Sequence, residues 1–243
     1  MKQIHRAYYI ACVFVLFLFF YPVLYFLGRS PKRNYRHIVR IRRILAVWSS
    51  FITGICFKIT YEQEIDWNKR YIIVANHTSN LDIAAIMILC PGNFSFIGKD
   101  ELLENPVTGF FFKTVDIAVK RSSKISSFRA FKRAEEYLLS GKSVAIFPEG
   151  GISDEYPPRL QEFKNGGFKL AIDLKIPILP VVIEDAWKIH WDDGKKLGSK
   201  PGSVHIRVLT PADPGQLGET VEELRNLVHG KMENVLSSNN YSK

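Results

Sequence analysis

The sequence predicts an α/β fold, with a mixed central sheet flanked by helices and an N-terminal membrane-associated helical segment. From about residue 57, short β-branched or aromatic runs alternate with segments of helical periodicity. Before them lies Ala7–Leu27, a stretch of 21 residues without a charged side chain. We therefore divide the chain into N-terminal membrane-anchoring helices at residues 1–56 and a globular domain at residues 57–243.

Ala7–Leu27 is long enough to cross a membrane. As a helix it would rise roughly 31 Å, which matches a hydrocarbon core. Pro22 lies inside it and could kink the helix, so a re-entrant or monotopic insertion is an alternative. The basic residues that follow it place the domain on the cytoplasmic side, which suggests a bacterial inner membrane; they are Arg29, Lys32, Arg33, Arg36, Arg40, Arg42 and Arg43.

The positive charge of the chain is confined to its N-terminal part. Residues 1–70 hold 12 Lys and Arg against 3 Asp and Glu, whereas residues 71–243 hold 21 of each kind. A nucleic-acid-binding protein would carry its basic patch on the folded domain, so no nucleic-acid partner is expected. A basic segment beside an apolar helix instead indicates a membrane phospholipid surface as partner.

A second helix is predicted over His37–Phe57, basic on one side and apolar on the other. It could lie among lipid headgroups or pack against the domain as a core helix, and the pattern does not choose between the two.

The elements of the domain follow from short apolar runs bounded by Gly, Pro, Asn or Asp. Helices are expected at Ser127–Ser140 and Gly166–Leu174, and a Thr220–Glu223 capping box is expected to open a C-terminal helix. Seven strands are expected, at Phe57–Glu62, Tyr71–Ala75, Phe94–Ile97, Asp116–Val119, Ser143–Phe147, Ile178–Ile183 and Val204–Leu209.

The turn after the second predicted strand carries a histidine and an aspartate five positions apart. His77 is the kind of side chain that moves a proton near neutral pH, and Asp82 could fix its tautomer. These residues form a general-base dyad if a substrate supplies the nucleophile. The alternative is that Ser79 and Asp82 form a capping box and Asp82 only starts a helix.

Two further turns carry residues suited to anions. Lys99 and Arg121 each follow a predicted strand, where α/β sheets bind ligands, and both types of cation bind phosphate. Glu149, Gly150 and Gly151 follow another strand, and paired glycines let backbone N–H groups approach an anion. We expect Glu149 to orient a hydroxyl or the base.

Signatures for other chemistry are missing from the sequence. It has no G-x-S-x-G, P-loop, HExxH or GxGxxG motif, and Cys12, Cys56 and Cys90 have no metal-ligand spacing. No metal and no bound cofactor are therefore expected.

These segments, in this order, resemble the four blocks of the glycerolipid acyltransferase family, whose bacterial type member is 1-acylglycerol-3-phosphate acyltransferase. The first block is Asn76-His77 with Asp82, and the second runs from Lys99 to Arg121. The third is Phe147-Pro148-Glu149-Gly150 and the fourth is Ile176–Val181. The match covers roughly residues 57–210.

The resemblance implies that residues 57–243 are an acyltransferase catalytic domain. His77 would be the general base and Asp82 its partner. Substrate would be held by Asn76, Lys99, Arg121, Glu149, Gly150 and Gly151. The donor would be acyl-CoA or an acyl thioester of acyl carrier protein (acyl-ACP), and the acceptor a lysophospholipid, lysophosphatidic acid above all, in phospholipid biosynthesis.

The sequence departs from the family at one position. The third block usually continues Thr-Arg-Ser after Glu-Gly, but Ile152 stands here where the arginine would be. Arg159 or Lys164 could supply the charge instead, or the acceptor could be another lyso-lipid. A non-catalytic membrane lipid-binding scaffold is a third reading.

Overall fold

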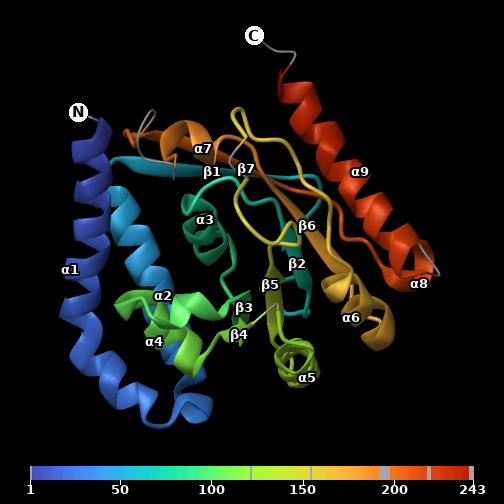
Figure 1. Ribbon diagram of the computed structural model, residues 1–243, viewed down its shortest axis with the longest axis horizontal. Helices are drawn as coiled ribbons and strands as arrows, with labels where there is room; N and C mark the ends of the chain where they lie inside the picture. Colours follow the sequence, from blue (N-terminus) through green and yellow to red (C-terminus); the bar gives the residue numbers. More distant parts are fainter. Residues whose placement is uncertain (1, 121, 154, 192–197, 218–219, 241–243) are drawn as a thin grey trace.

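The computed structural model describes residues 2–120, 122–153, 155–191, 198–217 and 220–240, which form one mixed sheet between two layers of helices (Figure 1). The strands lie in the order β1-β7-β6-β2-β5-β3-β4, and β7 pairs with β6 in the antiparallel sense while the other neighbours are parallel. They are β1 (Ile55–Tyr61), β2 (Ile72–Ala75), β3 (Phe94–Lys99), β4 (Ile117–Val119), β5 (Ser143–Ile146), β6 (Ile178–Ile183) and β7 (Gly202–Val208).

The seven predicted strands are confirmed, each end lying within two residues of its expected position. The mixed sheet is also confirmed. Because the strands carry apolar residues on both faces, each face of the sheet is covered by a layer of helices. In β2, Ile73 packs on one side of the sheet and Ile72 and Val74 on the other, as alternate residues of a strand must.

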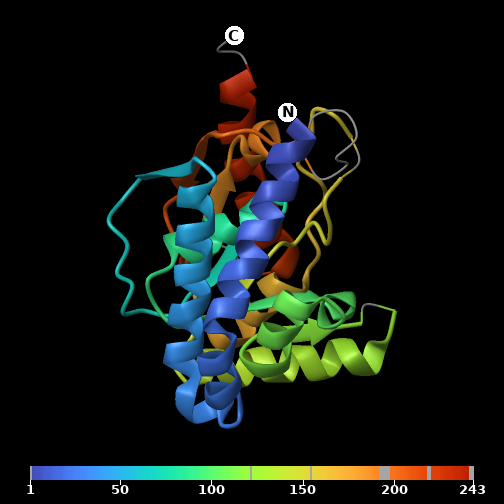
Figure 2. The same ribbon diagram turned by 90° about the vertical axis from the view of Figure 1, so that its left-hand side faces the viewer.

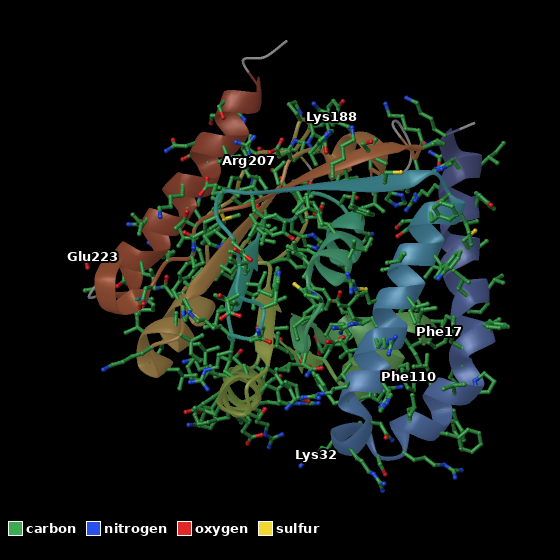
Figure 3. All side chains as sticks on the ribbon, turned by 180° about the vertical axis from the view of Figure 1, so that it is seen from behind. Phe17, Lys32, Phe110, Lys188, Arg207 and Glu223 are labelled. Carbon is green, nitrogen blue, oxygen red and sulfur yellow. The ribbon has the colours of Figure 1, made fainter. Side chains whose placement is uncertain are left out.

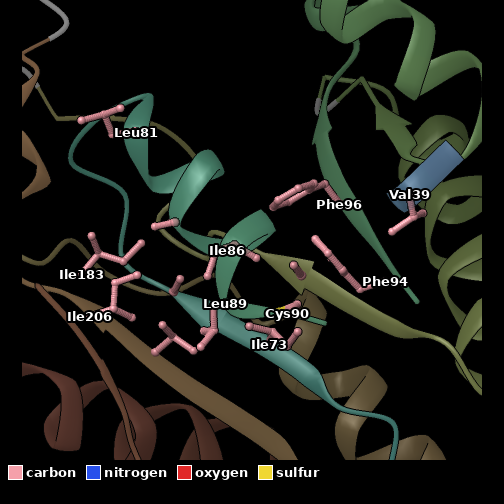
Figure 4. Close-up of a cluster of buried hydrophobic side chains, with 14 of the residues drawn as sticks. Val39, Ile73, Leu81, Ile86, Leu89, Cys90, Phe94, Phe96, Ile183 and Ile206 are labelled. Atoms are coloured by element: carbon pink, nitrogen blue, oxygen red, sulfur yellow. The ribbon is translucent and has the colours of Figure 1, made fainter. Parts of the chain in front are cut away.

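One helical layer is built mainly from the N-terminal half of the chain. Figure 4 shows its core, where Leu89 of α3 lies beside Ile73 and Ile206 of the sheet. Its members are α1 (Lys2–Gly28), α2 (Pro31–Ile52), α3 (Leu81–Leu89), the 3-10 turn η1 (Asp100–Leu103), α4 (Pro106–Thr114) and α7 (Ala186–Ile189).

The other layer covers the opposite face of the sheet. Ala134 and Leu138 of α5, Phe168 of α6 and Val228 of α9 bury their side chains there. The predicted Thr220 capping box opens α9, since the Glu223 N–H donates to Thr220 Oγ1 and the Thr220 N–H to Glu223 Oε2. The members are α5 (Lys124–Leu139), α6 (Gly166–Leu174), α8 (Pro214–Leu217) and α9 (Val221–Asn240).

The second helix begins and ends earlier than predicted. α2 starts at Pro31, a favoured first helical position, and ends before Gly54, whose φ of 71° no helix interior adopts. α2 buries Ile38, Arg42 and Leu45 on the domain and exposes Trp48 and Phe51 near its end. It is therefore a core helix over most of its length, and the predicted boundary at residues 56 and 57 falls inside β1.

α1 is an apolar helix that lies along the side of the domain and exposes most of its surface (Figure 2). Among the described helices it alone is long and apolar enough to cross a membrane, with 11% of its most apolar window buried. At one end the Ser199 N–H donates to the carbonyl of Lys2, and His5 contacts Ser199 and Thr53. Toward the other end Phe17 meets Phe110 of α4 edge to face, the pair labelled in Figure 3.

Candidate active site

Three of the predicted motifs meet at the carboxyl edge of the sheet. β2 leads into residues 76–80 and then α3, while β5 leads into residues 147–151. β2 and β3 both pair with β5 in the parallel sense, so the three carboxyl ends lie at one edge. This edge is where open α/β sheets bind their ligands.

His77 and Asp82 form the predicted pair. His77 Nδ1 lies 3.1 Å from Asp82 Oδ2, and the same oxygen accepts the N–H groups of Thr78 at 2.6 Å and Ser79 at 2.8 Å. Asp82 is fully buried at the start of α3. Burial raises the pKa of Asp82 above its usual range, opposed by the hydrogen bonds from His77, Ser79 and Thr78. Asp82 therefore both orders the turn before α3 and holds the imidazole, so the helix start and the contact expected of a dyad occur together.

This contact fixes the tautomer of His77. A carboxylate only accepts, so the proton sits on Nδ1, and the Nε2 lone pair is left for a substrate. Phe147 stacks on the ring with centroids 4.1 Å apart, and only 13% of the His77 side chain is exposed. The imidazole is thus held in plane and in orientation, as a general base requires.

Glu149 contacts the backbone of two loops. Its Oε1 accepts the N–H of His77 at 2.6 Å, and its Oε2 accepts the N–H of Gln161 at 2.8 Å. Burial is the main cause that raises the pKa of Glu149 to about 7, and the two N–H groups and His77 oppose it. Glu149 therefore fixes the main chain at His77, and its expected part in orienting a base or hydroxyl stays a prediction. Gly150, at φ 88°, turns the chain directly after it.

Asn76 is engaged by the neighbouring strand. Its Nδ2 donates to the carbonyl of Ile183 at 2.9 Å, and its Oδ1 accepts the Ile183 N–H at 2.7 Å. The amide thus extends the pairing between β2 and β6 by one residue and positions His77. That Asn76 contacts substrate stays a prediction.

A cavity of about 350 Å³ opens beside His77. Exposed Lys99 and Glu101 stand at its mouth with Gly150, Gly151 and Ile152, and fully buried Arg42 and Asp116 line its inner part. Its remaining walls are mainly apolar, from Ile83, Met87, Phe96, Ile97, Leu102, Phe111, Phe112 and Phe147. A mainly apolar lining of this kind suits a ligand with an apolar chain.

The predicted anion-binding residues are partly brought together. Lys99 ends β3 and its ammonium reaches the glycine turn, since a Cβ on Gly151 would lie 4.0 Å from Lys99 Nζ. Ile152 lines the same cavity as His77, so the position that carries arginine in the family does face the site. Arg159 and Lys164, which could supply the charge of the missing arginine, both have exposed side chains. Arg121 lies outside the described residues.

Sequence reasoning missed Arg42 and Asp116. The Arg42 guanidinium is 1% exposed, pairs with the Asp116 carboxylate, donates to the carbonyl of Phe94 and lies over the rings of Phe94 and Phe96. The signal was present in α2, because Arg42 falls in the buried series Ile38, Arg42, Leu45 at helical spacing. The exposed arginines nearby in the sequence, Arg36 and Arg40, obscured this buried position.

α1 reaches the active-site turn through one residue. Tyr9 packs its ring on His190, with centroids 5.5 Å apart, and the carbonyl of His190 accepts the Ser79 hydroxyl at 2.6 Å. Ser79 also supplies one of the N–H groups on Asp82. The N-terminal helix is thus part of the support of the dyad.

Within the described ranges, no group of three or more His, Cys, Asp or Glu side chains is placed to hold a metal ion.

Comparison with known proteins agrees with this geometry. The family model described as Acyltransferase matches residues 56–184. An uncharacterised acyltransferase of Schizosaccharomyces pombe is 31% identical over 183 residues, covering 74% of this chain and 64% of that protein. The 1-acyl-sn-glycerol-3-phosphate acyltransferase alpha of Mus musculus is 26% identical over 208 residues, covering 84% and 70%. This chain thus spans slightly less than two thirds of the length of the first relative.

The fold has a solved counterpart. The crystal structure of the 1-acyl-sn-glycerophosphate (LPA) acyltransferase PlsC from Thermotoga maritima superposes with a TM-score of 0.79 at 21% identity, covering 98% of this chain and 95% of that one. The His77–Asp82 turn and the Glu149-Gly150 turn both lie inside the span of the family model. The chain belongs to the acyltransferase family, and the resemblance to PlsC-like glycerolipid acyltransferases found in its sequence motifs is confirmed.

Proposed function

We propose that this protein is a membrane-associated enzyme that moves an acyl chain from an acyl thioester to the free hydroxyl of lysophosphatidic acid, giving phosphatidic acid. The observation that carries the proposal is the His77–Asp82 pair at the mouth of an apolar cavity. The relatives named as acyltransferases for 1-acyl-sn-glycerol-3-phosphate support the same acceptor.

The chemistry follows from the tautomer of His77. Nε2 takes the proton of the acceptor hydroxyl as its oxygen attacks the thioester carbonyl, and the new C–O bond forms as the C–S bond breaks. The proton passes from His77 to the departing thiolate, so no other reactant is needed. The Asp82 carboxylate stabilises the imidazolium between the two transfers.

In this proposal the apolar chain of the donor and the phosphate of the acceptor each lie against side chains of matching polarity. An acyl chain lies against Phe96, Phe111 and Phe112, while Lys99 and the Gly150-Gly151 turn face the acceptor's phosphate at the mouth. α1, with Phe14, Phe19 and Phe26 exposed, would rest in the membrane that holds both lipids, with the domain on the cytoplasmic side.

Ile152 motivates a second candidate, in which the acceptor is a lyso-lipid without a phosphate. Exposed Lys99 and exposed Glu101 both line the cavity, so its exposed side chains carry both signs of charge. That balance suits a zwitterionic headgroup as well as a phosphate.

The test is acyl transfer by purified protein, with lysophosphatidic acid and an unphosphorylated lyso-lipid offered in parallel. We expect transfer to lysophosphatidic acid, and a loss of about 10²–10⁴-fold in kcat for His77→Ala at unchanged unfolding temperature. Activity on the unphosphorylated acceptor alone would select the second candidate. Folded protein that transfers to neither would favour the non-catalytic lipid-binding scaffold.

A further inference from the structure

The start of α5 carries an exposed face that the proposed reaction does not use. Ile125, Phe128, Arg129 and Lys132 follow at helical spacing i, i+3, i+4 and i+7, and all four are exposed, Ile125 by 67% and Phe128 by 62%. We call these four residues the α5 face. Ile125 and Phe128 thus form a small exposed apolar surface that is flanked by two cations.

The surroundings of the α5 face are basic. Residues 117–134 contain six Lys and Arg and no Asp or Glu, although the domain as a whole is balanced. Phe128 and Lys132 also line a groove of about 630 Å³ between α5 and α6, to which Lys169 of α6 contributes. Asp173 and Glu222 lie in the same groove, and Lys132 pairs with Glu135. Within the groove Lys132 and Lys169 are balanced by Asp173 and Glu222, so the excess of cations comes from the other basic residues of this segment. That excess suits an acidic partner with a small apolar contact.

The position of α5 separates this partner from the membrane. α1 and α2 belong to the core on one face of the sheet, and α5, α6 and α9 to the core on the other. In Figure 1, α5 and α6 accordingly lie across the sheet from α1. A flat bilayer against the outer side of α1 leaves the groove between α5 and α6 facing water.

The position of α5 also places a docked partner at the same edge of the sheet as the proposed site of reaction. α5 follows β4, which pairs in parallel with β3 and so ends at the edge of the sheet that carries His77. A partner docked on the first turns of α5 therefore lies at the same edge of the sheet as Lys99, which pairs with Val119 of β4 and lines the cavity beside His77.

We propose that the α5 face docks the acyl donor as a thioester of a small acidic carrier protein, so that acyl carrier protein rather than free coenzyme A delivers the acyl chain. The inference rests on the proposed function, since it needs a thioester donor. The apolar pair Ile125 and Phe128 forms the centre of the contact, and Arg129 and Lys132 with their basic neighbours steer the acidic partner onto it.

The experiment compares two donors on two charge-reversed proteins. In Arg129→Glu/Lys132→Glu we expect the KM for acyl-ACP to rise at least about tenfold with kcat retained, and the KM for acyl-CoA to stay unchanged. Lys58→Glu/Lys69→Glu makes the same change of charge at exposed positions outside α5 and should leave both KM values unaltered. Added salt should raise the wild-type KM for acyl-ACP and remove the difference between the two variants.

Three results would overturn the proposal. They are equal effects of the α5 reversal on both donors, transfer from acyl-CoA but not from acyl-ACP, and a loss of vesicle binding in the α5 variant without a change toward acyl-ACP. Binding of acyl carrier protein measured without acceptor separates docking from catalysis. If no donor supports transfer, the proposed function fails, while tight, α5-dependent binding would still support the docking surface.

Discussion

At the scale of single residues, the site is a set of acceptors placed around one imidazole. Asp82 Oδ2 serves three donors, and the two oxygens of Glu149 serve two loops. His77 is thus held by its side chain from one direction and by its backbone N–H from another.

The substitution Asp82→Asn separates the two tasks of this residue. The amide oxygen that it introduces can still accept the N–H groups of Thr78 and Ser79, but the variant loses the charge that stabilises the imidazolium. We expect kcat to fall roughly 10²–10⁴-fold with little change in the KM for the acceptor. Steady-state kinetics together with a melting curve check this. A turnover near that of the wild type would leave Asp82 with the structural task alone.

The raised pKa of Glu149 predicts a pH dependence of stability. Its ordinary pKa is 4.5 and its folded pKa is about 7, so the folded protein binds the extra proton between these values. The stabilisation is therefore fully present below pH 4.5 and is lost as the pH rises through 7.

Glu149→Gln should remove this dependence. Between pH 5 and 8 we expect the free energy of unfolding of the wild type to fall by roughly 1–3 kcal/mol relative to the variant. Urea titrations of both proteins at the two pH values measure it, and other titrating groups cancel in the difference. Parallel profiles would contradict the assignment.

The residues of the site show how much of its geometry could be predicted from the sequence. The His77–Asp82 contact follows from the spacing of a strand, a turn and a helix start, so it was predictable. The contacts of Asn76 and Glu149 were not, because they depend on the backbone groups of Ile183 and Gln161, which are distant in sequence. A motif tells which residues gather, whereas long-range pairing decides which atoms they contact.

At the scale of elements, an ion pair joins α2 to the sheet. Arg42 and Asp116 are both buried, and Asp116 also accepts the Phe96 N–H of β3. Taking away one member would leave the other charge buried without its partner, which is costly in a protein interior.

Arg42→Met tests this contact. We expect a loss of about 3–5 kcal/mol in the free energy of unfolding, part of which Arg42→Met/Asp116→Asn should recover. Denaturant unfolding in detergent measures both values. Should the double variant be no more stable than the single one, the charge of Asp116 is not what makes the loss large.

The elements were predictable where one rule dominates. Strands with apolar residues on both faces, such as Ile72–Ala75 and Ile178–Ile183, were found within a residue of their ends. α4 was missed although Asn105 caps it and Pro106 opens it, because it is only nine residues long and three phenylalanines give it little periodicity. The antiparallel pairing of β7 with β6 depends on where the chain returns, and no local pattern records that.

At the scale of the whole molecule, the contacts of α1 decide how the protein meets a membrane. As a helix of 27 residues it is about 40 Å long, yet Lys2 and His5 at one end and Gly28 at the other all touch the same domain. A helix fastened along its length cannot cross a bilayer while the domain stays on one side. We therefore expect α1 to lie in one leaflet.

Single cysteines placed along α1 test this in vesicles. In a background with Cys12 and Cys56 replaced by Ser, Lys2→Cys and Lys32→Cys should react equally with an impermeant maleimide added on the side of the domain. Phe19→Cys should be shielded by lipid although Phe19 is 75% exposed in the structure. Labelling of Lys2→Cys only from the opposite side would establish a transmembrane helix.

The chain of contacts from Tyr9 through His190 to Ser79 has a practical consequence for anyone preparing a soluble form of this enzyme. Deleting α1 would remove its exposed apolar surface, but it would also remove side chains that pack on the domain. The loop that carries His77 would then lose the support that it receives through Tyr9 and His190. The better design keeps α1 and exchanges outward residues such as Phe14, Phe19 and Phe26 for polar ones, leaving Tyr9, Phe17 and Leu24 in place.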